Sequence, residues 1–87
     1  LMERFLEALG KSSKVAYGYK DVKAALEANA VEVLLVSESV EDKISDELEE
    51  LAANSGCQYE IISLDTRDGQ QLRDLGGIGA LLRYDLR

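Results

Sequence analysis

Hydrophobic residues along this chain follow two alternating spacings. From Leu1 to Leu9 they recur every three or four positions, as on one face of an α-helix, and Gly10 stands where we expect that helix to end. Short apolar runs at 15–17 and 31–36 instead predict β-strands. The second run is nearly continuous and β-branched, which is typical of a strand covered on both faces of its sheet.

The same alternation continues to the end of the chain. Ser39 and Asp42 resemble a capping arrangement at a helix start, and Gly56 follows the last apolar position of that helix. Asp68 is placed to cap a shorter helix. The remaining predicted elements are a helix over about 19–29, a helix from Asp68 to the break at Gly76-Gly77, and strands over 58–64 and 78–84.

This order predicts an α/β fold. Strands that alternate with helices are joined by crossovers and tend to be parallel neighbours with helices on both faces. We therefore expect a three-layer α/β/α sandwich with a four-stranded mixed sheet. The 87 residues are enough for one domain over 1–87, and a chain that opens Leu1-Met2-Glu3 is expected to be a piece of a longer protein.

Charge is unevenly distributed along the sequence. The net charge is −7, and the segment 38–50 alone holds seven acids and one base, Lys43. Independent nucleic-acid binding depends on cationic contacts to phosphate, so this balance disfavours it. The simplest interpretation of the acidic segment is a solvated helix face; the alternative is a docking patch.

No catalytic chemistry is evident. The chain has no histidine, which removes the commonest general base and zinc ligand. Gly76, Gly77 and Gly79 lead into a strand, whereas a phosphate-binding loop leaves a strand and opens a helix. The single cysteine, Cys57, and the absence of a long apolar run favour a reducing, cytoplasmic location. We predict no enzyme activity, no cofactor, no metal and no membrane contact.

Three stretches in order resemble the C-terminal domain of the archaeal and eukaryotic class-one peptide chain release factors. They are KVAYGYKDVKAALEANAVEVLLVSE at 14–38, CQYEIISLDTRDGQQL at 57–72 and LGGIGALLRY at 75–84. The C-terminal domain of Pelota, the ribosome-rescue paralogue, is similar and stays open as an alternative. The resemblance implies a fold shared with kink-turn-binding ribosomal proteins and a non-catalytic role in translation termination.

In the release-factor family this domain binds a translational GTPase of the elongation-factor type, and the full-length protein reaches the ribosome. The family's Gly-Ile-Leu-Arg-Tyr motif, implicated in that binding, maps onto Ala80, Leu81, Leu82, Arg83 and Tyr84, with Ala80 replacing glycine. Alternation along a strand sends Leu81 and Leu82 to opposite faces, where a core role competes with partner binding. Arg83 and Tyr84 are of residue types that often dominate interface energy. The alternative for Arg83 is a salt bridge with nearby carboxylates, which contributes little if it is exposed.

Two further partner-binding candidates, Tyr19 and Lys20, open the second helix. Tyr17 and Tyr19 flank Gly18, and we expect one of the two rings to pack inside and the other to be presented at the start of that helix. Lys20 belongs to a group of bases around the first strand, with Lys11, Lys14 and Lys23. Such a basic group opposite the acidic segment would orient the domain against an acidic partner or ribosomal RNA. The alternative function is a small kink-turn RNA-binding protein. The residues at 17–21 do not match the RNA-contacting loops of those relatives, so direct RNA contact is expected to be weak or absent.

One departure from the release-factor pattern concerns an insertion. Release factors usually carry an inserted minidomain after the strand that ends near Ser37, but only residues 38–42 intervene here. Three explanations stay open: a short form, an insert missing from this chain, or a Pelota-type parent.

Overall fold

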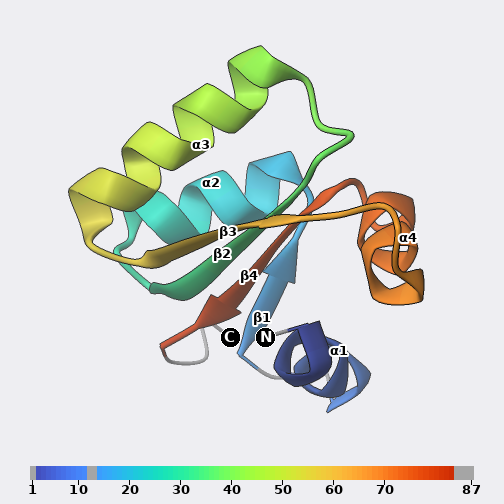
Figure 1. Cartoon of the computed structure of the whole chain (residues 1–87). Helices are drawn as coiled ribbons and strands as arrows, with labels where there is room; N and C mark the ends of the chain where they lie inside the picture. The colour runs from blue at the N-terminus through green and yellow to red at the C-terminus, as the bar shows by residue number, and fades with distance from the viewer. Residues whose placement is uncertain (1, 12–13, 84–87) are drawn as a thin grey trace.

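The fold consists of a central sheet with two helices on each face. The computed structural model describes residues 2–11 and 14–83. The sheet is seen in Figure 1 with α2 and α3 on one side and α1 and α4 on the other. In chain order the elements are α1 (Met2–Lys11), β1 (Val15–Tyr17), α2 (Tyr19–Glu27), β2 (Val31–Ser37), α3 (Asp42–Ser55), β3 (Gln58–Ile62), α4 (Arg67–Asp74) and β4 (Ile78–Leu82). The predicted three-layer α/β/α class is confirmed.

The sheet is mixed, with strand order β1-β4-β2-β3. Only β2 and β3 run parallel; β4 lies between β1 and β2 and is antiparallel to both. The predicted mixed sheet is confirmed, but the expected tendency to parallel neighbours is wrong for two of the three strand pairs. The reason is that the last strand returns to the middle of the sheet instead of adding to an edge.

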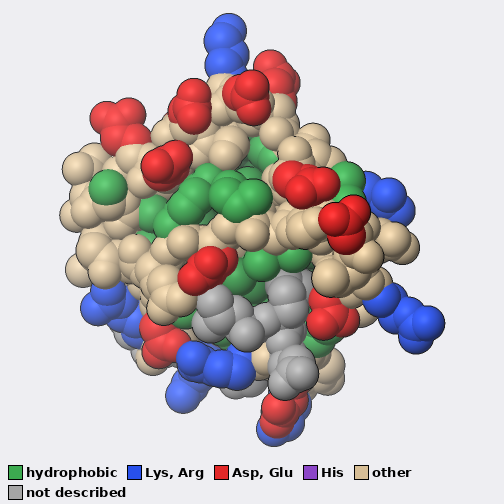
Figure 2. All heavy atoms as spheres, in the orientation of Figure 1, with side chains coloured by type: hydrophobic (Ala, Val, Ile, Leu, Met, Phe, Trp, Pro, Cys, Tyr) green, Lys and Arg blue, Asp and Glu red, His purple; other side chains and the backbone are tan. Residues whose placement is uncertain are grey.

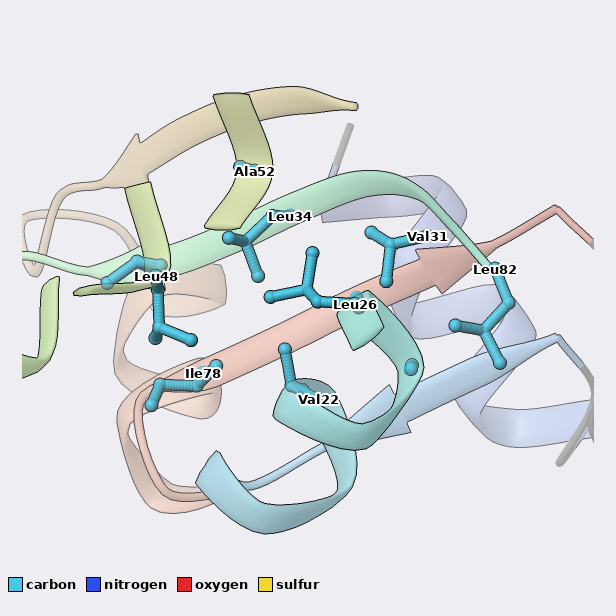
Figure 3. Close-up of a cluster of buried hydrophobic side chains, with 11 residues drawn as sticks. Val22, Leu26, Val31, Leu34, Leu48, Ala52, Ile78 and Leu82 are labelled. Carbon is cyan, nitrogen blue, oxygen red and sulfur yellow. The ribbon is translucent and has the colours of Figure 1, made fainter. Parts of the chain in front are cut away.

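Each face of the sheet has its own hydrophobic core. Toward α2 and α3 the strands contribute Leu34 and Val36, and Figure 3 shows Leu26 and Leu48 pointing at this face from the helices. Toward α1 and α4 lie Val33 and the fully buried Phe5 and Leu72. Because β2 is covered on both sides, its side chains are buried at every position except Glu32, as the continuous apolar run predicts.

The exception at Glu32 is a bulge. Val31 pairs with Leu82 and Val33 with Leu81, so Glu32 has no partner across the ladder. The bulge turns Val31 to the α2–α3 core, whereas Val33 faces the other one. The exposed Glu32 carboxylate is left to accept a hydrogen bond from Arg4 of α1 at 2.6 Å.

Three glycine positions were predicted to end or interrupt helices. Gly56 ends α3 with φ of 74°, and Gly77, at φ 81°, lies in the predicted break before β4, so both predictions are confirmed. Gly10 lies inside α1 and does not end it.

Both predicted helix caps are wrong. The Ser39 hydroxyl lies 2.8 Å from that of Ser37 and does not cap α3. The N-cap of α4 is Thr66, whose hydroxyl accepts the Gly69 N–H at 3.0 Å, whereas Asp68 lies within the first turn. The predicted extension of β4 to Tyr84 falls outside the described residues. In the part of the chain that is described, no helix is long and apolar enough to cross a membrane.

Candidate partner-binding site

Arg83 is held in place by backbone atoms of the neighbouring strand. The backbone N–H of Arg83 donates to the Ala30 carbonyl at 2.7 Å, and the side-chain Nε donates to the Val31 carbonyl at 3.1 Å. A guanidinium has five N–H donors, so the four on the two terminal nitrogens are left over. No carboxylate among residues 2–11 and 14–83 pairs with them. Arg83 is therefore an exposed fork, fixed at one corner, with the geometry that binds a carboxylate through two bonds.

A groove lies between α1 and the ends of β1 and β4. Its volume is about 340 Å³, and we call it the α1 groove; it is lined by Arg4, Glu7, Ala8, Lys11, Lys14, Leu81 and Leu82. Lys11 pairs with Glu7 at 3.0 Å, and Arg4 pairs with Glu32. The Lys14 side chain has no ion-pair partner in the described structure. Exposed ion pairs contribute little stability, so a partner's carboxylates can replace them at small cost.

Leu81 and Leu82 occupy the positions that strand alternation predicts. Leu81 packs in the α1–α4 core and Leu82 in the α2–α3 core, with 5% and 7% of their surface exposed. Side chains this buried offer a partner only the floor of the α1 groove. Both side chains therefore have the core role that was weighed against partner binding, and in the chain they lead directly to Arg83.

Tyr19 and Lys20 lie at the opposite end of the strands from Arg83. β1 and β4 are antiparallel, and the Gly18 N–H donates to the Ile78 carbonyl, so the start of α2 lies beside the start of β4. Arg83 follows the other end of that strand. At a rise of about 3.3 Å per residue, the five residues of β4 separate the two ends by roughly 13 Å. The predicted site residues therefore form two groups, and Tyr84 lies outside the described residues.

The Tyr19 group forms a tie between α2 and α3. The Tyr19 hydroxyl donates to Glu47 Oε1 at 2.8 Å, and Lys23 Nζ lies 3.3 Å from the same oxygen and 5.6 Å from the centre of the Tyr19 ring. The hydrogen bond from Tyr19, followed by that from Lys23, lowers the pKa of Glu47. The hydrogen bond to Glu47, followed by that to Tyr19, raises the pKa of Lys23. Tyr19 and Lys23, which were predicted to face a partner, thus contact Glu47 within the domain. Lys20 is exposed and unpaired among the described side chains.

The hydrogen bond from Tyr19 predicts how the pKa of Glu47 changes when the Tyr19 hydroxyl is removed. In a Tyr19→Phe variant the pKa of Glu47 should rise toward its ordinary value, because the largest stabilising contact of the carboxylate is gone. Since the pKa is lowered in the folded state, the contribution of Glu47 to stability is present above its unfolded pKa. It is lost as the pH falls through the folded pKa. Carboxyl NMR titration measures this, with Tyr17→Phe as the matched control because the exposed Tyr17 makes no such bond; an unchanged Glu47 pKa would contradict the assignment.

The sequence did not single out Arg4, Glu7 or Ala8, which line the α1 groove. They share one side of α1, at i, i+3 and i+4 spacing, next to the apolar face that carries Phe5. The sequence showed that these three residues share one side of a helix. It did not show that this side faces a groove, because that depends on the position of α1 beside β4.

Comparison with known proteins identifies the domain. The family model described as eRF1 domain 3 matches residues 1–86. The chain belongs to the eRF1 domain 3 family. This confirms the resemblance to the release-factor C-terminal domain, with Pelota as its close alternative.

Relatives of both kinds are similar to this eRF1 domain 3 chain. The protein pelota homolog of Pyrococcus furiosus is 39% identical over 92 residues, which cover the whole of this chain and 26% of that protein. The chain therefore spans about a quarter of the length of this curated relative. The archaeal translation termination factor aRF1 is also 39% identical, with a TM-score of 0.85 over 95% of this chain and 24% of that one.

Two further structures extend the comparison. The C-terminal domain of peptide chain release factor from Methanosarcina mazei has a TM-score of 0.91 and 31% identity, covering 98% of this chain and 80% of that one. S. cerevisiae Dom34 is a translation termination-like factor involved in RNA quality control pathways and interacting with Hbs1. It has a TM-score of 0.86 and 30% identity, over 98% of this chain and 26% of that one. The Methanosarcina structure shows that a domain of this family folds on its own.

Proposed function

We propose that this eRF1 domain 3 is a non-catalytic module that docks a translational GTPase of the elongation-factor type. The observation that carries the proposal is the Arg83 fork, which is anchored on the Val31 carbonyl and follows Leu82, a residue that lines the α1 groove. Arg4, Lys11 and Lys14 outnumber Glu7 in the lining of the groove, so its net charge is positive, and it opens over apolar side chains. It therefore suits a partner surface that combines carboxylates with an apolar residue. The interaction of Dom34 with Hbs1 supports a protein-docking role for this family.

The cellular setting follows from the family. We propose that the full-length protein acts on the ribosome in the cytoplasm, with this domain contributing contacts to the GTPase and no membrane contact. Tyr84 is proposed as a further partner-binding residue next to Arg83. The net charge of −7 and the pairing of Lys11 and Lys23 argue against a specific grip on RNA by this domain, and we expect no specific complex with a kink-turn RNA.

Whether the parent is a release factor or a Pelota-type rescue factor is the finer question. Identity is 39% to one protein of each kind. The connection from Ser37 to Asp42 is short, and a fifth of the Methanosarcina release-factor domain has no counterpart in this chain. These observations favour the Pelota alternative over the release-factor interpretation that the resemblance first suggests. A Gly-Gly-Gln tripeptide upstream in the parent protein would decide for termination, and its absence for rescue.

Charge reversal at Arg83 tests the docking proposal. Arg83→Glu should weaken binding to the GTP-bound partner by about 2 kcal/mol or more, roughly thirtyfold, because the free donors are replaced by a carboxylate that repels an acidic partner. Isothermal titration calorimetry with the elongation-factor-type GTPase of the parent organism measures the loss. The free energy of unfolding should fall by only about 1 kcal/mol, the value of one lost hydrogen bond.

Arg73→Glu is the matched control. Arg73 is an exposed arginine of α4 whose side chain pairs only with Asp74 within the described part, so its reversal changes the net charge equally. Equal loss of affinity in both variants would show that the loss comes from the change in net charge and not from the contacts of Arg83. Full affinity in Arg83→Glu would remove Arg83 from the interface.

A further inference from the structure

The outer edge of β3 is open. β3 is the last strand of the sheet, and no described strand lies on its far side. The Ile62 carbonyl accepts the Glu38 N–H on the β2 side, so by strand alternation the backbone N–H and C=O groups of Tyr59 and Ile61 point away from β2. Such groups are a template on which another extended chain pairs.

Three of the usual blocking devices are absent from this edge, and the one charged residue of β3 is Glu60. The chain contains no proline, β3 contains no lysine, and the register between β2 and β3 runs through five consecutive pairs without a bulge. The bulge of this sheet lies between β2 and β4, away from the edge. β3 therefore presents a regular edge.

An apolar side chain stands beside these free backbone groups. Ile61 is 51% exposed, and alternation places it on the same face as Tyr59, whose ring packs against the α2–α3 core and whose hydroxyl lies 2.9 Å from Ser45 Oγ of α3. A single exposed isoleucine is ordinary on a protein surface. Here it coincides with an unpaired strand edge, and added strands gain specificity from pockets and side chains spaced along that edge.

The charge around this edge has one sign. Residues 38–65, which form α3, β3 and the segments next to them, hold nine acids and one base, whereas the rest of the chain holds eight acids and nine bases. Figure 2 shows hydrophobic side chains in the area where Figure 1 draws α3 and β3, with Asp and Glu side chains around them. The excess negative charge of the whole domain thus lies on the open edge strand and the segments next to it in the chain.

We propose that the outer edge of β3 binds a basic, extended segment of a partner protein, which adds as a fifth strand. Backbone pairing holds the segment, an apolar residue of the segment contacts Ile61, and its lysines or arginines face the acids of α3 and β3. This surface is distinct from the α1 groove, which lies by the opposite edge strand, β1. The domain would then hold two partners at once.

Backbone amide NMR of the domain tests this with two synthetic peptides. The probe is a capped hexapeptide of alternating lysine and valine, and its counterpart carries glutamate in place of lysine. We expect the lysine peptide to shift the Tyr59 and Ile61 amides, with affinity falling as salt is raised. The glutamate peptide should bind at least tenfold more weakly, and N-methylation of the lysine peptide, which removes its pairing N–H groups, should abolish the shifts.

Two variants fix the location. Ile61→Lys should weaken binding of the lysine peptide by tenfold or more, whereas Tyr17→Lys, at a similarly exposed aromatic of the other edge strand, should leave it unchanged. Absence of shifts at β3 at millimolar peptide, equal binding of the glutamate peptide, or equal loss in both variants would overturn the proposal. Concentration-dependent dimerisation with shifts at Ile61 would overturn it in favour of a second copy of this chain. Each of these results leaves the GTPase titration of Arg83→Glu unaffected.

Discussion

Replacement of Gly69 by alanine should destabilise the domain by about 3 kcal/mol. Gly69 is buried in the first turn of α4, and a Cβ at this position would lie 1.7 Å from the carbonyl oxygen of Ser63. That oxygen belongs to the backbone and cannot rotate away. The turn would have to lift from Ser63 and would strain the bond between the Gly69 N–H and Thr66 Oγ1. Thermal unfolding should record a fall of roughly 12–24 °C in Tm.

Gly10→Ala is the control for this prediction. Gly10 also lies within a helix, α1, but no atom of residues 2–11 and 14–83 stands within 4 Å of its Cβ position. Alanine there should stabilise the domain by about 0.5–1 kcal/mol, since it reduces the freedom of the unfolded chain and improves helix propensity. If both glycine variants lose the same stability, the contact with Ser63 does not account for the effect.

Truncation of Phe5 to alanine should cost about 3–5 kcal/mol, because Phe5 is fully buried and joins α1 to the sheet. Its ring lies over Gly79 of β4, where an added Cβ would come within 2.6 Å of the ring. Gly79→Ala should therefore also destabilise the domain, but much less so in the Phe5→Ala background, where the ring is gone and the tight contact that remains is with Leu72 Cδ1 at 3.2 Å.

A double-mutant cycle measured by urea unfolding tests this coupling. The two single changes are expected to be non-additive by about 1–3 kcal/mol. Additive losses would show that the ring does not press on Gly79. The cycle also bears on function, because α1 forms one wall of the α1 groove and Phe5 fixes its position.

The helices and strands could be predicted from the sequence because their signals are local. The continuous apolar run of β2 requires a strand that is covered on both faces of the sheet. Gly56 and Gly77 stand where the backbone takes positive φ. Capping was less predictable, since Thr66 and Asp68 are both good N-caps and only the packing of Gly69 on Ser63 decides between them. The central position of β4 was not predictable, because it depends on contacts between residues far apart in the chain.

The candidate site was predicted in part. The motif at 80–84 pointed to Arg83, but nothing in the sequence shows that the Val31 carbonyl holds its side chain or that α1 forms a basic groove beside it. Tyr19 was expected to present its ring to a partner, and the structure engages its hydroxyl with Glu47. The open edge at Ile61 was also missed, because a strand pattern does not reveal which strand ends the sheet.

The central claim is that the GTPase contacts the side of the domain that carries Arg83 and the α1 groove. Hydrogen–deuterium exchange of the unmodified domain, with and without the GTP-bound elongation-factor-type partner, tests it most directly. We predict slower exchange in α1 and in the edge strand β1, with α3 and β3 unchanged. Protection confined to α3 and β3, with α1 and β1 exchanging as in the free domain, would contradict the claim.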